Sequence, residues 1–228
     1  MSRVALVTGG SRGIGAAISI ALKNAGYTVA ANYAGNDEAA AAFTAETGIK
    51  TYKWSVADYD ACAAGIAKVE ADLGPVEILV NNAGITRDAM FHKMTPQQWK
   101  EVIDTNLSGV FNMTHPLWSG MRDRKFGRVI NISSINGQKG QAGQANYSAA
   151  KAGVTAMAVV WSRELARYGI RAASIAPGFT QTDLLAGMPP EMLAKVTAPI
   201  PLRRLCLPGE VAQAAVFIAE NDYFTGRS

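Results

Sequence analysis

Residues 3–15 read RVALVTGGSRGIG, and this stretch decides the fold. Its short apolar run predicts a buried strand, and the pattern over about 13–25 predicts an amphipathic helix. Gly9, Gly13 and Gly15 lie between them, where glycine lets the backbone turn tightly and approach a bound group closely. The start of the helix supplies free N–H groups and the positive end of its dipole. The stretch therefore predicts a site for the pyrophosphate of a dinucleotide.

The spacing of these glycines is a weak signal by itself. It is GxxxGxG and not the GxGxxG of the standard dinucleotide fingerprint, so a plain glycine-rich turn is the alternative. No Gly-Lys-Ser/Thr follows, which excludes a P-loop NTPase. The position of the glycines between a strand and a helix favours the cofactor interpretation.

The alternation of short strands and longer helices continues along the chain. It predicts an α/β protein with a single Rossmann-type doubly wound parallel sheet and helices on both faces. No domain boundary is evident, so residues 1–228 are expected to form one nucleotide-binding domain. Ligands of such sheets bind at the carboxyl ends of the strands. The further strands are expected at 28–33, 50–55, 77–81, 127–132 and 170–175.

The composition excludes several classes of function. The chain of 228 residues has a formal net charge of +4 with dispersed basic residues, which argues against a nucleic-acid-binding surface. No apolar run approaches the ~20 residues of a membrane span. Two cysteines and two histidines give neither a disulfide framework nor a His-rich site. We therefore expect a cytoplasmic protein without a bound metal or a His-based catalytic triad.

The end of the second expected strand indicates which dinucleotide is bound. NAD sites place an acidic residue there for the ribose 2′-hydroxyl, but none occurs between Asn32 and Asn36. Arg12, in the glycine loop, is suited to a 2′-phosphate. Both features favour NADP. A surface arginine and a mixed cofactor preference are the alternative.

Tyr147 and Lys151 stand four residues apart, on one face of an expected helix. A free tyrosine has a pKa of about 10, and a neighbouring ammonium group lowers it by stabilising the phenolate. The pair is a candidate for acid–base catalysis, with an exposed helix face as the alternative. Ser134 ends a strand earlier in the chain, and its hydroxyl can bond the carbonyl oxygen that the tyrosine protonates. No GxSxG surrounds Ser134, which disfavours a hydrolase nucleophile.

Six motifs stand in order along nearly the whole chain: Thr8-Gly-x-x-x-Gly-Ile-Gly15, Asn81-Asn-Ala-Gly84, Asn106, Ser134, Tyr147-x-x-x-Lys151 and Pro177-Gly178. Together they resemble the short-chain dehydrogenase/reductase family, and the combination is specific although each motif is weak alone. The resemblance implies a Rossmann-type domain, an NADP-dependent oxidoreductase acting on a ketone or alcohol, and a homotetramer.

The resemblance also implies four catalytic roles. Tyr147 is expected to be the general acid of ketone reduction, and Lys151 to bind the nicotinamide ribose and lower the tyrosine pKa. Ser134 is expected to orient the substrate carbonyl, and Asn106 to hold a water that relays protons to Lys151. Because charge develops on the carbonyl oxygen during hydride transfer, two O–H groups and a cation are suited to meet it.

A larger set of cofactor contacts is implied around the carboxyl ends of the strands. Many family members have Asp or Asn after the third strand for the adenine, and Ser55-Val56 departs from that pattern. The expected cofactor residues are Gly9, Ser11, Arg12, Gly13, Ile14, Gly15, Asn32, Ser55, Val56, Asn82, Ala83, Gly84, Tyr147, Lys151, Pro177, Gly178, Thr180 and Thr182.

The polar segment from Ser134 to Asn146 leads into the catalytic helix and is expected to wall the substrate pocket. It resembles the acetoacetyl-CoA reductases, a branch of the family that acts in polyhydroxyalkanoate synthesis. The implied reaction is NADPH-dependent reduction of a short 3-oxoacyl-CoA, specifically acetoacetyl-CoA to (R)-3-hydroxybutyryl-CoA. The alternatives are a 3-oxoacyl-acyl-carrier-protein reductase and an NADP-binding scaffold without activity. Expected substrate contacts are Ser134, Asn136, Gln141, Gln144, Tyr147 and Phe179, with a solvated loop as the alternative for the glutamines.

The resemblance is uneven along the chain. Residues 1–153 closely resemble the acetoacetyl-CoA reductases, whereas the part from Val154 onward resembles another short-chain reductase branch, which suggests a chimera. A lid over the substrate is expected from Gln181 to about Arg204. The sequence stops at Ser228, before the last strand of the family, so we expect an exposed sheet edge.

Overall fold

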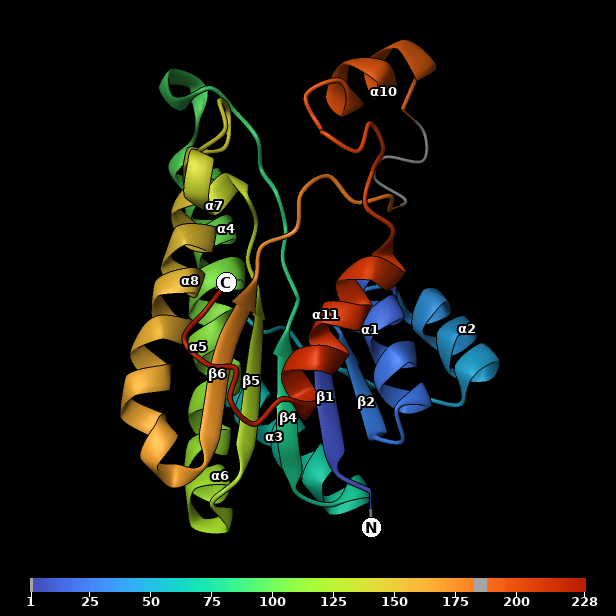
Figure 1. The fold of residues 1–228 in the computed structure, drawn as a ribbon, viewed down its shortest axis with the longest axis vertical. Coiled ribbons are helices and arrows are strands. Elements are labelled where there is room, and N and C mark those ends of the chain that lie inside the picture. Colours follow the sequence, from blue (N-terminus) through green and yellow to red (C-terminus); the bar gives the residue numbers. More distant parts are fainter. Residues whose placement is uncertain (1, 183–187) are drawn as a thin grey trace.

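Six parallel strands form one sheet in the order β3-β2-β1-β4-β5-β6 (Figure 1). The computed structural model describes residues 2–182 and 188–228. The chain builds outward from β1 to β3 and then returns to β4 on the other side, which creates the reversal of strand order where ligands bind in such sheets. The expected fold class is confirmed. The strands are β1 (Val4–Thr8), β2 (Thr28–Tyr33), β3 (Lys50–Lys53), β4 (Val76–Asn81), β5 (Gly127–Ile132) and β6 (Ile170–Ile175).

Helices cover both faces of the sheet (Figure 1). One face packs against α1 (Gly13–Asn24), α2 (Asp37–Thr47) and α11 (Pro208–Glu220). The other packs against α3 (Tyr59–Leu73), α5 (Gly109–Thr114), α6 (Trp118–Arg124) and α8 (Ala145–Leu165). Beside α8 lie α4 (Pro96–Ile103) and the short α7 (Asn136–Lys139). The remaining elements are η1 (Phe91–Lys93), η2 (Asp104–Ser108), η3 (His115–Leu117), η4 (Ala166–Tyr168) and α10 (Pro190–Thr197).

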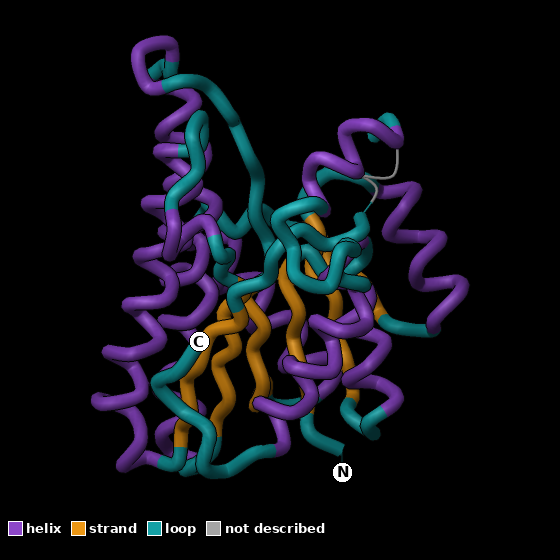
Figure 2. The backbone as a smooth tube through the Cα atoms, turned by 45° about the horizontal axis from the view of Figure 1, so that its top comes forward, coloured by secondary structure: helices purple, strands orange, loops and turns teal. Residues whose placement is uncertain are grey.

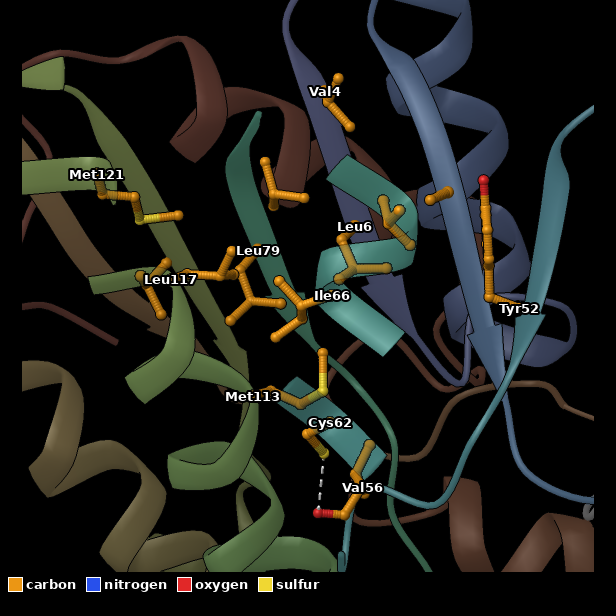
Figure 3. Close-up of a cluster of buried hydrophobic side chains, with 14 of the residues drawn as sticks. Val4, Leu6, Tyr52, Val56, Cys62, Ile66, Leu79, Met113, Leu117 and Met121 are labelled. Carbon is orange, nitrogen blue, oxygen red and sulfur yellow. Dashed lines mark hydrogen bonds between the residues drawn. The ribbon is translucent and has the colours of Figure 1, made fainter. Parts of the chain in front are cut away.

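Side chains of the central strand β1 alternate between the two hydrophobic cores. Val4 and Leu6 belong to the core shown in Figure 3, whereas Ala5 and Val7 face the core on the opposite side. Burying a side chain such as leucine stabilises the fold by about 1.5–3 kcal/mol. Cys62 lies in the core of Figure 3, where burial raises the pKa of its thiol to about 12. Such a thiol is unreactive and structural.

Polar side chains cap two of the helix starts. Asp58 accepts a hydrogen bond from the N–H of Ala61 at 2.9 Å and begins α3. Asn36 accepts from the N–H of Ala39 at 2.9 Å and begins α2. These caps satisfy N–H groups that have no partner within the helix, and each contributes about 1 kcal/mol.

The segment that follows α11 returns to the sheet and runs beside β6 (Figure 1). The N–H of Gly226 donates to the oxygen of Ala172 at 2.7 Å, and the N–H of Ser174 donates to the oxygen of Arg227 at 2.8 Å. No strand follows β6 in the part of the chain that the structure describes, yet these bonds cover part of its edge. The edge is therefore less open than the sequence suggests.

Within residues 2–182 and 188–228, no helix is long and apolar enough to cross a membrane. The same residues contain no group of three His, Cys, Asp or Glu side chains placed to hold a metal ion.

Candidate active site

The loops that follow the strands gather at one end of the sheet (Figure 2). Thr8, Asn81 and Ile132 are the last residues of β1, β4 and β5, which are neighbours in the sheet. Because all strands are parallel, their carboxyl ends share one edge. The glycine loop, the segment 82–84 and Ser134 therefore meet there, although they are far apart in the sequence.

The glycine loop has a backbone that requires glycine. Gly9 and Gly13 have φ angles of +60° and +52°, in the left-handed region. A Cβ on Gly15 would lie 2.1 Å from the carbonyl oxygen of Gly9 and 2.6 Å from Nδ2 of Asn82. Helix α1 starts at Gly13, so its first N–H groups have no partner within the helix. This cradle of close backbone and free N–H groups fits a pyrophosphate.

Asn82 and Thr8 hold the glycine loop in place. Nδ2 of Asn82 donates to the carbonyl oxygen of Thr8 at 2.9 Å. In return, Oγ1 of Thr8 accepts from the N–H groups of Asn82 and Ala83 at 2.9 and 3.0 Å. The segment 82–84 thus braces the cradle from the end of β4.

Two residues expected at the adenosine end of the cofactor have buried side chains. Asn32 is 1% exposed, and its Nδ2 donates at 3.0 Å to the oxygen of Trp54, one residue past the end of β3. Val56 is packed into the hydrophobic core. Ser55 is exposed, and its Oγ accepts from the N–H of Ala57 at 3.3 Å. The structure thus brings Ser55 to the surface, while the side chains of Asn32 and Val56 serve the sheet and the core.

Tyr147, Lys151 and Ser134 come together as the sequence predicts. Tyr147 and Lys151 lie in the first two turns of α8, with Nζ of Lys151 5.7 Å from the centre of the tyrosine ring. Nζ donates to the carbonyl oxygen of Ile132 at 2.6 Å. Ser134 follows two residues later, and its hydroxyl lies close enough to the phenol of Tyr147 to lower the pKa of that group. Oγ of Ser134 also accepts from the N–H of Asn136 at 3.1 Å.

Burial controls the protonation of this pair. It raises the pKa of Tyr147, the hydrogen bond of Ser134 lowers it, and the nearby carboxylate of Asp88 raises it. The net shift is opposite to the expected lowering by Lys151, because removing water from the phenol outweighs the other effects. Burial also lowers the pKa of Lys151 to about 8. Lys151 is 4% exposed, so its ammonium form has lost nearly all contact with solvent.

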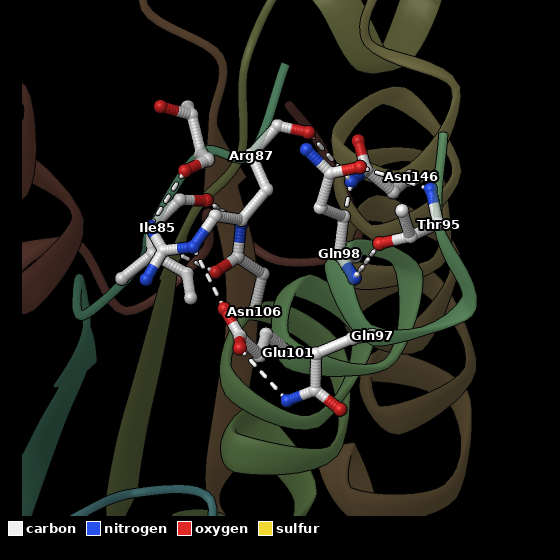
Figure 4. A network of polar contacts seen from close by, with 9 residues as sticks. Ile85, Arg87, Thr95, Gln97, Gln98, Glu101, Asn106 and Asn146 are labelled. Carbon is white, nitrogen blue, oxygen red and sulfur yellow. Dashed lines mark hydrogen bonds and ion pairs between the residues drawn. The ribbon is translucent and has the colours of Figure 1, made fainter. Parts of the chain in front are cut away.

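Asn106 lies in the π-helical turn η2 and is completely buried. Its Oδ1 accepts from the N–H of Ile85 at 2.8 Å, and its Nδ2 donates to the oxygen of Ile85 at 2.9 Å (Figure 4). π-Helical turns are frequent at functional sites. The side chain of Asn106 thus fastens the segment after β4 to the helices beside α8.

Two of the expected substrate residues are joined in a chain with Asp88. Nδ2 of Asn136 donates to Oε1 of Gln144 at 2.9 Å, and Nε2 of Gln144 donates to Oδ2 of Asp88 at 2.8 Å. Oδ1 of Asn136 is buried and has no partner among the described residues. Gln141 lies exposed on the preceding loop.

The segment 177–182 crosses from Ser134 to the glycine loop. The oxygen of Pro177 accepts from the N–H of Ile135 at 3.1 Å. At the other end, a Cβ on Gly13 would lie 3.6 Å from Cγ2 of Thr182. Thr180, between them, is buried. The segment therefore lies between the candidate catalytic residues and the glycine loop.

The two ends of the expected lid are joined by backbone hydrogen bonds. The oxygen of Phe179 accepts from the N–H of Cys206 at 2.9 Å, and the oxygen of Cys206 accepts from the N–H of Gln181 at 2.8 Å. The expected lid, 181–204, therefore begins and ends at one place above the sheet. Its residues 183–187 lie outside the described residues, and α10 belongs to the described part.

Three polar residues near the site were missed by the sequence reasoning: Asp88, Ser133 and Asn146. Oγ of Ser133 donates to the backbone oxygen of Lys151 at 2.8 Å. Asp88 accepts the hydrogen bond that the side chain of Gln144 donates. Ser133 and Asn146 each precede an expected catalytic residue in the sequence, and this adjacency was the available signal.

Comparison with known proteins agrees with this geometry. The profile of a family described as short chain dehydrogenase matches residues 3–192. The chain belongs to the short-chain dehydrogenase family. An acetoacetyl-CoA reductase of Paracoccus denitrificans is 68% identical over 229 residues, which cover 99% of this chain and 95% of that protein. An acetoacetyl-CoA reductase of Rhizobium meliloti (strain 1021) is 66% identical with the same coverage. A 3-oxoacyl-[acyl-carrier-protein] reductase of Staphylococcus aureus is 41% identical, covering 100% of this chain and 96% of that protein.

These matches bear on two expectations. The two acetoacetyl-CoA reductases match 99% of this short-chain dehydrogenase, so they give no evidence that its two parts come from different lineages. The chimera hypothesis is therefore unsupported. Membership of the family implies a nicotinamide cofactor, and the cradle around Gly15 fits the pyrophosphate of that cofactor.

Proposed function

We propose that this short-chain dehydrogenase reduces a short 3-oxoacyl-CoA with NADPH, specifically acetoacetyl-CoA to (R)-3-hydroxybutyryl-CoA. The observation that carries the proposal is the meeting of Ser134, Tyr147 and Lys151 beside the glycine loop, at the carboxyl edge of the sheet. The substrate is inferred from the two acetoacetyl-CoA reductases that are 68% and 66% identical to this chain.

NADPH would supply the hydride that reaches the carbonyl carbon of the substrate. The hydroxyl of Ser134 donates a hydrogen bond to the carbonyl oxygen and fixes its position. Tyr147, protonated at neutral pH because burial raises its pKa, gives its phenolic proton to that oxygen. The ammonium group of Lys151 stabilises the resulting phenolate and binds the nicotinamide ribose. Lys151 then passes a proton to the phenolate, which restores the phenol, and the water held by Asn106 returns a proton to Lys151.

The pocket residues are assigned by their chemistry. Asn136 is placed beside the substrate together with Gln144, to which its Nδ2 donates a hydrogen bond. Gln144 and Gln141 are placed at the thioester, and Phe179 packs over the short acyl group. The charge of +4 favours the capture of a substrate that carries phosphates.

We infer that the cofactor is NADP and not NAD, because Arg12 is exposed at the start of α1 and no acid ends β2. In Arg12→Ala, the Kd for NADPH is expected to rise roughly 10- to 100-fold, since a hydrogen bond between charged groups contributes about 1.5–3 kcal/mol. The Kd for NADH should change less than about threefold, because NADH has no 2′-phosphate. Fluorescence titration of both cofactors measures this difference, and equal losses for both would contradict the role of Arg12.

The pH dependence of the reduction rate should follow the protonation of Lys151. Its pKa is lowered to about 8, so the ammonium form is present below that pH and is lost above it. Tyr147 stays protonated through this range because its pKa is raised. We expect kcat/KM for reduction to be level below about pH 7 and to fall roughly tenfold per pH unit above about pH 8.5. A rate that stays level to pH 9.5 in stopped-flow assays would show that another group controls the reaction.

The function itself is tested by following NADPH oxidation with acetoacetyl-CoA. Turnover well above background supports the proposal, and no turnover by folded, NADPH-binding protein rejects it. Comparing acetoacetyl-CoA with acetoacetyl-acyl-carrier protein decides between this reaction and that named for the Staphylococcus aureus relative. Cofactor binding without turnover of any ketone would favour a scaffold, against which the complete set of Asn106, Ser134, Tyr147 and Lys151 argues.

We also propose that residues 1–228 act as one domain in a cytoplasmic homotetramer. Trp99, Phe111 and Val160 are 42%, 46% and 50% exposed on α4, α5 and α8, and such apolar side chains favour contact with further copies of the chain. Light scattering of the purified protein gives the mass of the assembly directly.

A further inference from the structure

Asn146 directly precedes Tyr147 in the first turn of α8, and its side chain is completely buried. Its Nδ2 donates to the backbone oxygens of Arg87 and Gln98, both at 3.1 Å (Figure 4). Its Oδ1 accepts from the N–H of Tyr147 at 2.8 Å. Two acceptors and one donor around the amide match the two N–H groups and the oxygen of asparagine.

The three partners of Asn146 come from three separate parts of the chain. Arg87 lies in the segment between β4 and η1, Gln98 lies in α4, and Tyr147 lies in α8. The N–H of Tyr147 is in the first turn of α8, where a backbone N–H has no partner within its helix. One buried side chain thus ties the start of the catalytic helix to α4 and to the segment 85–88.

The segment 85–88 is held at both ends by residues already assigned to the site. Asn106 bonds the backbone of Ile85 in both directions, and Asp88 accepts from Gln144. Figure 4 shows Asn106 and Asn146 reaching this segment from two different helical elements. A further ion pair links Arg87 to Glu101 at 2.7 Å, and both of these side chains are partly exposed.

We propose that Asn146 is a positioning residue, which fixes Tyr147 relative to the segment 85–88, where Asp88 bonds Gln144, one of the expected substrate residues. The inference rests on the proposed function, because it assigns Tyr147 the proton transfer. Tyr147 follows Asn146 directly, so a shift of the first turn of α8 moves the phenol. A misplacement of about 1 Å in a catalytic group costs up to about 100-fold in rate.

The test uses two substitutions and one control. Asn146→Ser keeps an oxygen near the N–H of Tyr147 but is too short to reach the other two partners. Asn146→Asp keeps the size and the acceptor but replaces the two donated hydrogen bonds with repulsion between oxygens. Glu101→Gln weakens the exposed ion pair on the same segment and leaves the bonds of Asn146 intact. The concentration of sites is determined by NADPH titration, so that kcat refers to folded, cofactor-binding protein.

We expect kcat with acetoacetyl-CoA to fall about 10- to 100-fold in both Asn146 variants, with the Kd for NADPH changed less than about twofold. Glu101→Gln should keep kcat within about twofold. A residue that merely supports the fold would lower the number of sites and leave kcat per site unchanged. Wild-type kcat per site in Asn146→Ser would therefore overturn the proposal.

Hydrogen exchange provides a second readout that needs no substrate. In Asn146→Ser, peptides from 85–90 and from 145–150 should both exchange about tenfold faster or more than in the wild type, because one side chain holds both. Unchanged exchange in 85–90 would overturn the proposal, even if the variant binds little cofactor. If the wild-type protein does not reduce acetoacetyl-CoA, the proposed function is rejected. Faster exchange of both peptides in Asn146→Ser would then still support the role of Asn146 in joining the two segments.

Discussion

Tyr147→Phe is expected to lower kcat for reduction of acetoacetyl-CoA by about 10²- to 10⁴-fold, the range that a positioned general acid contributes. Phenylalanine retains the ring that lies 5.7 Å from Nζ of Lys151 but has no proton to give. The Kd for NADPH should remain within about threefold, since the glycine loop and the segment 82–84 are untouched. Steady-state kinetics and fluorescence titration measure the two quantities separately.

A matched control for this prediction is Tyr168→Phe. Tyr168 lies in η4 at the far end of α8, where its ring packs edge-on against Trp118. Loss of that hydroxyl should leave kcat unchanged. Activity of Tyr147→Phe equal to that of the wild type would remove Tyr147 from the proton transfer, whatever the substrate of the enzyme.

Gly15→Ala is expected to weaken cofactor binding strongly. The added Cβ would lie 2.1 Å from the oxygen of Gly9 and 2.6 Å from Nδ2 of Asn82, so the loop or α1 must move. Overpacking of this kind destabilises a protein by about 1–3 kcal/mol. We expect the Kd for NADPH to rise about tenfold or more, equivalent to at least about 1.4 kcal/mol of lost binding free energy.

Gly209→Ala is the control for this change. Gly209 lies in α11, and a Cβ there would have no atom within 4 Å, so the alanine should not lower stability. Urea unfolding measures the loss of stability in both variants, and NADPH titration measures the loss of cofactor affinity separately. Wild-type cofactor affinity in Gly15→Ala would mean that the cradle is not where the pyrophosphate binds.

Local patterns were sufficient to predict most of the fold. The expected strands 28–33, 127–132 and 170–175 coincide with β2, β5 and β6, because short apolar runs between helical patterns indicate strands in an α/β chain. The expected third strand, 50–55, extends beyond β3, which ends at Lys53. The backbone leaves the sheet there and buries Val56 in the core, which depends on packing and not on local propensity.

In the candidate site, too, some features follow from local sequence and others depend on tertiary contacts. Ser134, Tyr147 and Lys151 follow from their residue types and spacing, and they meet in the structure. Asn32 was expected to contact the cofactor, and its amide donates to the oxygen of Trp54, one residue past the end of β3. Which way a polar side chain at a strand end points depends on partners distant in the sequence, so no local pattern predicts it.

The amino-acid sequence was sufficient to predict the doubly wound sheet, the glycine cradle and a candidate acid–base pair, because periodicity, backbone freedom and reactive groups are local properties. The tertiary structure alone decided the protonation of that pair. Burial raises the pKa of Tyr147 and lowers that of Lys151, and it depends on which helices and loops surround the two residues. The hydrogen bonds by which Asn146 joins three parts of the chain also depend on the tertiary structure, because distant segments can bond only when the fold brings them together.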